Sequence, residues 1–200
     1  MNIISSNCLG GFIYKDVLNS DYKNPFIWTR FEFDTFVDFI NHYEEINFNN
    51  VMIDRIGNTL SNNFTTIIDD KYTFKNRHIC FSKQYTKPTV KREGFVMVYY
   101  NKPWEYILEK YNSRVKRMLE LNERPIIVYY DPDHKITKEN LEKLSKVFED
   151  KNYKCLIFTD KTIIPSMTTT VINFKHKKEP WHLELINKHK ETILNFLYAV

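Results

Sequence analysis

The sequence predicts a single α/β domain of three layers, in which a mostly parallel sheet carries helices on both faces. The last third of the chain alternates apolar strands with helical segments that are joined by short connections. Such strand–helix–strand units form right-handed crossovers between parallel strands. The continuous apolar run at 125–130 is typical of a strand that is buried on both faces. A small antiparallel insertion, irregular and rich in β-forming residues, is expected at about 56–94.

Length and composition are those of one folded domain, residues 1–200, with no internal linker or repeat. The chain is 42% hydrophobic and 16% aromatic, which argues against disorder. Its net charge of +4 is small and its charges are mixed along the chain, which argues against nucleic-acid binding. Three cysteines without framework spacing argue against a disulfide-stabilised secreted scaffold. The sequence has no secretory signal and no apolar run of membrane-spanning length, so we expect a cytoplasmic protein.

Hydrophobic periodicity places each element along the chain. Strands are expected at 2–6, 50–56, 65–74 (a hairpin around Asp69 and Asp70), 78–82, 95–100, 125–130, 154–159 and 168–174. Helices are expected at 12–18, 33–46, 103–121, 137–149 and 183–198, with Thr137 as the N-cap of the fourth.

The carboxyl ends of the parallel strands are the expected place for a site, because ligands of open α/β sheets bind there. A thiol, two histidines, two asparagines and several carboxylates follow the predicted strands: Asn7, Cys8, Asn101, Asp131, Asp133, His134, Asp160 and His176. If these strands are mutually parallel, the eight side chains lie along one edge of the sheet.

Cys8 is the central candidate, because it stands in the turn between the first strand and the first helix. A thiol at a helix N-terminus has a lowered pKa, which favours the nucleophilic thiolate. Gly10 and Gly11 would let backbone N–H groups approach an anion or oxyanion. The alternative is that Cys8 is a small buried residue in a tight turn. Cys80 and Cys155 lie inside predicted strands and are assigned to the core.

A general base for Cys8 is sought among the residues that follow the other strands. His134 or His176 would take the proton, and Asp133 or Asp160 would orient the imidazole. The run 131–134, Asp-Pro-Asp-His, also resembles a divalent metal site, but a proline-containing turn with local hydrogen bonds is the preferred interpretation. The sequence therefore predicts no metal and leaves the cofactor unknown.

Arg114 and Arg117 lie three residues apart on one face of the helix predicted at 103–121. Together they could hold a phosphate or carboxylate, although such pairs are also common on solvated faces. No phosphate loop, G-x-G-x-x-G or G-x-S-x-G motif is present, which argues against ordinary nucleotide-binding enzymes and α/β-hydrolases.

The opening run Ile3-Ile4-Ser5-Ser6-Asn7-Cys8-Leu9-Gly10-Gly11-Phe12-Ile13-Tyr14 resembles the signature of a bacterial family labelled exopolysaccharide biosynthesis proteins. The run 24–27, the helix at 33–46 and the basic helix segment 111–117 are similar to later parts of that family. A weaker similarity, through the early cysteine and the run 25–28, is to a family labelled papain-like cysteine peptidases. The first resemblance implies that Asn7, Cys8, Gly10, Gly11, Arg114 and Arg117 form a site and that the substrate is a glycan or glycan precursor.

One departure from the family leaves two functions open. The family has a strand that ends in His-Tyr, and this chain has Tyr99-Tyr100 there. The first hypothesis is a thiol-dependent transferase or hydrolase that moves acyl or glycosyl groups of a surface glycan. The second is a non-catalytic glycan-binding module, in which exposed Trp28, Trp104 and Trp181 would stack on sugars. Oligomeric state does not follow from the sequence.

Overall fold

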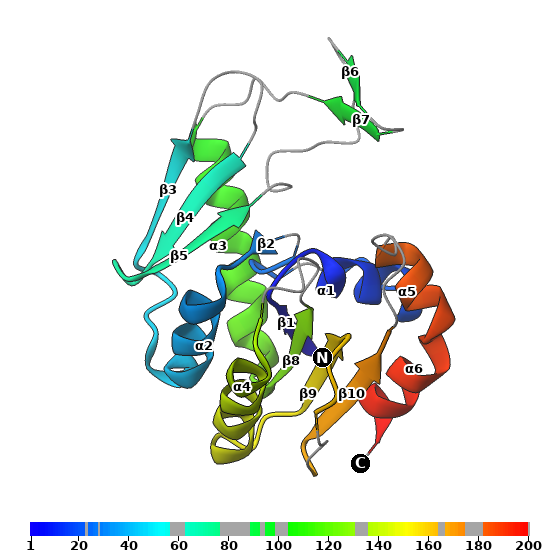
Figure 1. The fold of residues 1–200 in the computed structure, drawn as a ribbon. Coiled ribbons are helices and arrows are strands. Elements are labelled where there is room, and N and C mark those ends of the chain that lie inside the picture. The colour runs from blue at the N-terminus through cyan, green and yellow to red at the C-terminus, as the bar shows by residue number, and fades with distance from the viewer. Residues whose placement is uncertain are drawn as a thin grey trace.

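The computed structural model describes residues 1–22, 24–27, 29–56, 63–76, 89–92, 95–98, 104–130, 136–163, 167–174 and 182–199, with only the backbone for 53–56, 63–65, 76, 89–92, 95–98 and 104–107 (Figure 1). The strands are β1 (Asn2–Ser5), β2 (Thr29–Arg30), β3 (Val51–Ile56), β4 (Asn63–Ile68), β5 (Tyr72–Asn76), β6 (Thr89–Arg92), β7 (Phe95–Val98), β8 (Pro125–Tyr130), β9 (Cys155–Thr159) and β10 (Thr169–Asn173). The helices are α1 (Leu9–Phe12), η1 (Ile13–Val17), α2 (Phe33–Asn41), η2 (Tyr43–Glu45), α3 (Trp104–Leu121), α4 (Lys138–Asp150), α5 (His182–Lys188) and α6 (Lys190–Tyr198).

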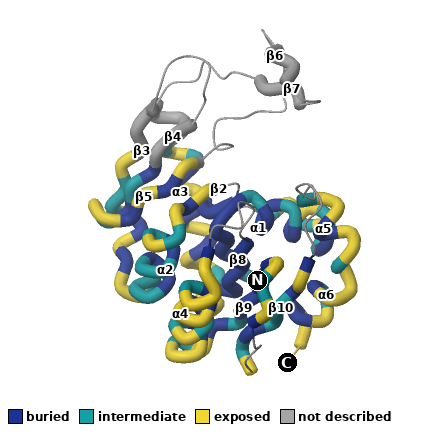
Figure 2. The backbone as a smooth tube through the Cα atoms, in the orientation of Figure 1, coloured by how far each residue is buried: buried dark blue, intermediate teal, exposed yellow. Residues whose placement is uncertain are grey.

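A parallel sheet forms the centre of the fold, as predicted, and it has four strands. Its order is β1-β8-β9-β10, and every neighbouring pair is parallel. The register pairs Ile4 with Ile127 and Tyr129 with Ile157. All residues of β8 and β9 are buried, because helices cover both faces of these inner strands (Figure 2).

Side-chain alternation along the strands divides the core between the two faces of the sheet. Ile3, Ile126 and Val128 belong to one apolar cluster, together with residues of α1, η1, α5 and α6. Ile4 and Ile127 belong to the other, together with residues of α2, α3 and α4. Helices therefore cover both faces, in the three layers visible in Figure 1 and expected from the sequence.

The antiparallel part is larger than predicted. Its order is β2-β5-β4-β3, and Thr29 pairs with Asn76, so the sheet begins before α2 rather than at about 56. The hairpin between β4 and β5 is confirmed, and Asp69 and Asp70 both have positive φ, 55° and 54°, in its turn. β6 and β7 form a separate antiparallel pair. The strand expected at 78–82 lies outside the described residues.

A cluster of phenylalanines joins the antiparallel sheet to α2. The rings of Phe31 and Phe74 are stacked with centroids 4.8 Å apart, and Phe36 in α2 lies 5.4 Å from Phe31. The Phe36 ring in turn lies 6.0 Å from that of Tyr129 in β8. Aromatic pairs at these separations add specific stabilisation to simple burial. The high aromatic content thus contributes to the core between the two sheets.

Several helix boundaries differ from the prediction. The first helix begins at Leu9 rather than at residue 12 and continues as the π-helix η1. The α-helix expected at 33–46 ends at Asn41, and the C-terminal helix is divided at His189 into α5 and α6. Thr137 is the predicted N-cap of α4, and its hydroxyl accepts a hydrogen bond of 3.2 Å from the Asn140 N–H.

Candidate functional site

The candidate site is the edge of the parallel sheet where its four strands end. Because all four strands run in the same direction, the segments that follow them emerge at one edge. The segment 6–8 follows β1, and Asp160 follows β9. The segments after β8 and β10 contain Asp131, Asp133, His134 and His176, which lie outside the described residues.

Asn7 attaches the turn after β1 to the end of β8. Its side-chain N–H group donates to the carbonyl of Tyr130 at 3.0 Å, and its amide oxygen accepts from the Leu9 N–H at 3.0 Å. Ser6 reinforces this link, since its N–H donates to the Val128 carbonyl at 3.0 Å. Asn7 is only 8% exposed. In this structure its polar groups position the turn.

Cys8 occupies the N-cap position of α1. Its backbone carbonyl accepts from the N–H groups of Gly11 and Phe12 at 3.1 and 3.4 Å. Its side chain is half-buried, in contrast to the fully buried Cys155, whose pKa is raised by burial. Cys155 is the core residue that the sequence predicted, and Cys80 lies outside the described residues. Of the two described thiols, Cys8 is the more accessible.

Gly10 has a packing role that is independent of any ligand. A Cβ atom at this position would lie 2.8 Å from the Cβ of Ser5, closer than real Cβ contacts. The absence of a side chain therefore lets α1 lie directly against β1. The N–H of Gly11 is already bonded to the Cys8 carbonyl, so this group is not available to the anion nest that the sequence suggested.

Asp160 stands at the same edge, at the end of β9. Its carboxylate forms an ion pair of 3.2 Å with the ammonium group of Lys161. The Thr159 hydroxyl accepts from the Lys161 N–H at 3.1 Å and fixes this corner. The topological argument that placed Asp160 beside the segment after β1 is supported by the parallel order β1-β8-β9.

Two predicted binding residues, Arg114 and Arg117, do not belong to this edge. A third, Asn101, was expected to follow a strand of the parallel sheet; within the described residues β7 pairs with β6 instead, and Asn101 itself lies outside those residues. Arg114 is 4% exposed on α3, on the opposite face of the sheet from α1. Burial raises the pKa of the Tyr22 hydroxyl, and the positive charge of Arg117 partly offsets this rise. Arg117 therefore lies near Tyr22. Tyr22 belongs to the amino-terminal edge of the sheet, described below.

His182 lies at this edge, although the sequence did not single it out as a candidate. Its ring stacks on Phe12 of α1 with centroids 5.7 Å apart and an interplanar angle of 19°. Tyr130, the last residue of β8, meets the same imidazole edge-on at 5.3 Å. Phe12 is one helical turn from Cys8, so the imidazole lies beside the helix that carries the thiol. The available signal was the position of His182 at the start of a helix that follows a parallel strand.

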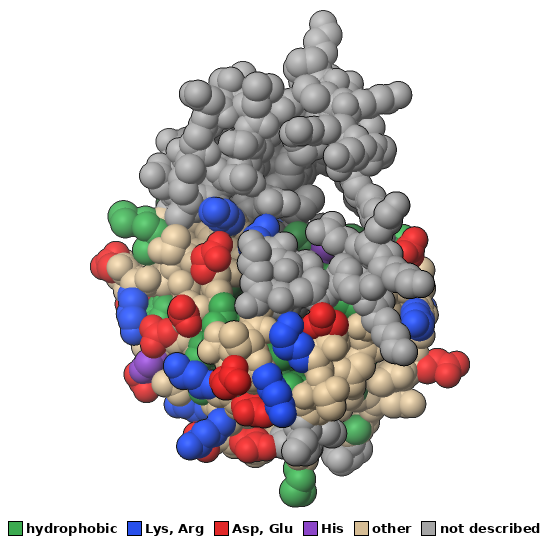
Figure 3. Space-filling model, in the orientation of Figure 1, with side chains coloured by type: hydrophobic (Ala, Val, Ile, Leu, Met, Phe, Trp, Pro, Cys, Tyr) green, Lys and Arg blue, Asp and Glu red, His purple; other side chains and the backbone are tan. Residues whose placement is uncertain are grey.

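Further observations concern metal binding, membrane spanning, surface charge and the tryptophans. Within the described ranges, no group of three or more His, Cys, Asp and Glu residues could hold a metal ion. No helix in the part of the chain that the structure describes is long and apolar enough to cross a bilayer. Figure 3 shows acidic and basic side chains interspersed on the visible face. The side chains of Trp28, Trp104 and Trp181 lie outside those described.

Comparisons of the chain with protein-family models, curated proteins and solved structures found no match.

Proposed function

We propose that the protein is a thiol-dependent transferase or hydrolase that acts on a surface glycan or its precursor, with Cys8 as the nucleophile. The observation that carries the proposal is that a half-buried thiol, at the start of α1, and an imidazole, stacked on Phe12 of the same helix, lie at the carboxyl edge of a parallel sheet. The glycan substrate rests on the resemblance of the opening run to exopolysaccharide biosynthesis proteins.

The chemistry is acyl transfer in two steps. His182 takes the proton of Cys8, and the thiolate attacks the carbonyl carbon of an acyl ester or thioester donor. The bond to the leaving group breaks, and His182 returns the proton to that group. A sugar hydroxyl, or water in a hydrolase, then attacks the thioester and passes its proton to His182. The carbon–sulfur bond breaks, and His182 delivers this proton to the departing Cys8 sulfur, which regenerates the thiol and the neutral imidazole. Each step forms one bond and breaks one, so no redox partner is required.

Neighbouring residues restrain the turn that contains Cys8 and the imidazole of His182. Asn7 fixes the turn through Tyr130, and the same Tyr130 ring contacts the imidazole of His182. The stack on Phe12 limits the rotation of the imidazole. A catalytic base has to be held in place by such packing, since small displacements reduce the rate steeply.

Alkylation of the folded protein with iodoacetamide, followed by peptide mass spectrometry, tests the proposal. We expect Cys8 to react much faster than Cys155 and to become reactive below the free-thiol pKa of ~8.5. Cys155 is the internal control, because it is buried in the core. If Cys8 reacts as slowly as Cys155, a nucleophilic role for Cys8 is excluded.

An inert Cys8 would favour the second candidate, a non-catalytic glycan-binding module. That alternative has its own motivating observation, the sequence Tyr99-Tyr100 in place of the family's His-Tyr. A Cys8→Ser variant also distinguishes the two candidate functions, because it removes group transfer but would leave simple glycan binding intact.

A further inference from the structure

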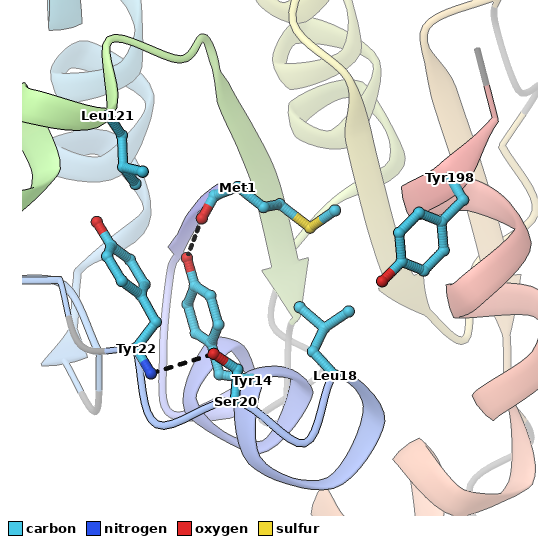
Figure 4. A pocket seen from close by; sticks show the side chains of 7 residues that line it. All are labelled: Met1, Tyr14, Leu18, Ser20, Tyr22, Leu121 and Tyr198. Carbon is cyan, nitrogen blue, oxygen red and sulfur yellow. Dashed lines mark hydrogen bonds between the residues drawn. The ribbon is translucent and has the colours of Figure 1, made fainter.

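A pocket lies at the amino-terminal edge of the parallel sheet, whereas Cys8 follows the carboxyl end of β1. Figure 4 shows the residues that line the pocket. Met1 directly precedes β1, and Leu121 ends α3 shortly before β8 begins. The pocket has a volume of about 270 Å³ and is lined by Met1, Tyr14, Leu18, Ser20, Tyr22, Leu121 and Tyr198. In the close-up, Leu121 and Tyr22 lie on one side of Tyr14 and Tyr198 on the other.

Backbone and side-chain hydrogen bonds hold the floor of the pocket in place. The Tyr14 hydroxyl accepts from the Ile3 N–H at 2.7 Å and donates to the Met1 carbonyl at 3.0 Å. The Ser20 N–H donates to the Tyr14 carbonyl at 2.8 Å, and the Ser20 hydroxyl accepts from the Tyr22 N–H at 3.1 Å. The residues between η1 and Tyr22 are thus preorganised before any ligand binds.

The lining combines ring faces with hydroxyl groups. The rings of Tyr14 and Tyr22 are tilted against each other at 5.3 Å, and Tyr198 is 66% exposed at the other side. The Ser20 hydroxyl can still donate, and the Tyr198 hydroxyl is at the surface. Met1, Leu18 and Leu121 supply an apolar wall. Such a surface suits a ligand that has an apolar face and hydroxyl groups around its rim.

Charge and size define the ligand further. No lining side chain is ionised at neutral pH, and the ammonium group of the lining residue Met1 is ion-paired with the Glu123 carboxylate. Arg117 and Glu123, which both act electrostatically on Tyr22, carry opposite charges. A neutral ligand is therefore favoured over an anion. Pockets for drug-sized molecules have volumes of roughly 300–1,000 Å³, so this smaller one fits a single ring.

We propose that this pocket binds one neutral sugar ring. The ring's C–H face lies on the tyrosines and leucines, and its hydroxyl groups bond to Ser20 and Tyr198. The pocket lies at the opposite edge from Cys8, so it is a second site whose existence does not depend on the thiol chemistry. In a protein that acts on glycans, it would bind a sugar separate from the one that reacts at Cys8.

NMR of the full chain with ¹³C-labelled methionine and leucine methyl groups tests the proposal. The probes are methyl glycosides of glucose, galactose and N-acetylglucosamine, with adenine as a planar aromatic comparison. We expect saturable shifts of Met1, Leu18 and Leu121 with at least one glycoside. The absence of a shift with all three glycosides, or a shift with adenine alone, would overturn the assignment.

Two variants test whether the sugar binds in this pocket. Tyr198→Ala removes an exposed ring, leaves the core intact and should weaken binding roughly tenfold, as truncation of an aromatic contact does. Leu119→Ala is the matched control, because Leu119 is 48% exposed near the end of α3 but does not line the pocket. Equal affinities of the Tyr198→Ala and Leu119→Ala variants would place the sugar elsewhere. Cys8 alkylation is expected to be the same in both variants, so failure here is distinguishable from failure of the thiol proposal.

Discussion

The imidazole of His182 and the ring of Phe12 are stacked at 5.7 Å, although they lie at opposite ends of the chain. This contact joins α5 to α1 at the edge of the sheet where β1 ends. It brings a titratable ring close to the turn of Cys8. A structural role and a catalytic role for His182 make different predictions, because only the second needs the ring nitrogens.

His182→Phe separates these roles. The substituted ring can still stack on Phe12 and contact Tyr130, so we expect the free energy of unfolding to change by less than about 1 kcal/mol. If His182 takes the proton of Cys8, the alkylation rate of Cys8 near neutral pH should fall roughly tenfold or more. Urea denaturation and alkylation kinetics measure the two effects. An unchanged alkylation rate would leave His182 with packing alone.

Gly10→Ala should destabilise the protein. The new Cβ would meet the Ser5 Cβ at 2.8 Å, so α1 has to move away from β1. Overpacking of this kind costs about 1–3 kcal/mol, measured as a shift of the urea midpoint. Ser5→Gly removes the clashing atom, so the double variant should be less destabilised than the sum of the two single changes. Simple additivity would contradict the proposed contact.

Tyr14→Phe and Tyr111→Phe form a matched pair of hydroxyl deletions. The Tyr14 hydroxyl bonds to the Ile3 N–H and the Met1 carbonyl, so its removal leaves a buried N–H without a partner and should cost about 1–3 kcal/mol. The buried Tyr111 hydroxyl has no hydrogen bond to the described residues. Its removal should be neutral or stabilising. Thermal unfolding compares the two, and an equal loss in both would refute the distinction.

The parallel arrangement of the central sheet, though not its strand order, could be predicted because its signals are local. β8 and β9 are continuous apolar runs, and the α4 connection between them is short and begins at a recognisable cap, Thr137. The extent of the antiparallel sheet could not be predicted in the same way. β2 has only two residues, and its pairing with β5 depends on contacts between distant segments of the chain.

The candidate site was predicted only in part, for a related reason. Cys8 and Asp160 follow from the rule that parallel strands end at one edge. The placement of Arg117 at the other edge depends on the direction of α3, which the helical periodicity does not reveal. His182 could be identified as a candidate only from its ring contacts with Phe12 and Tyr130, which are distant from it in sequence.

The stability of the protein should decrease in mild acid, partly because of His189. Burial lowers the pKa of His189, with a smaller effect from Lys188. The unfolded chain, with a histidine pKa of ~6.5, therefore binds protons more readily than the folded protein, and stability is lost as the pH falls through this range. His189→Gln should reduce the difference in free energy of unfolding between pH ~7.5 and ~5, measured by urea denaturation. Lys188→Gln, which keeps the histidine, is the control and should retain most of the difference. An unaltered pH dependence in His189→Gln would show that other groups cause the loss.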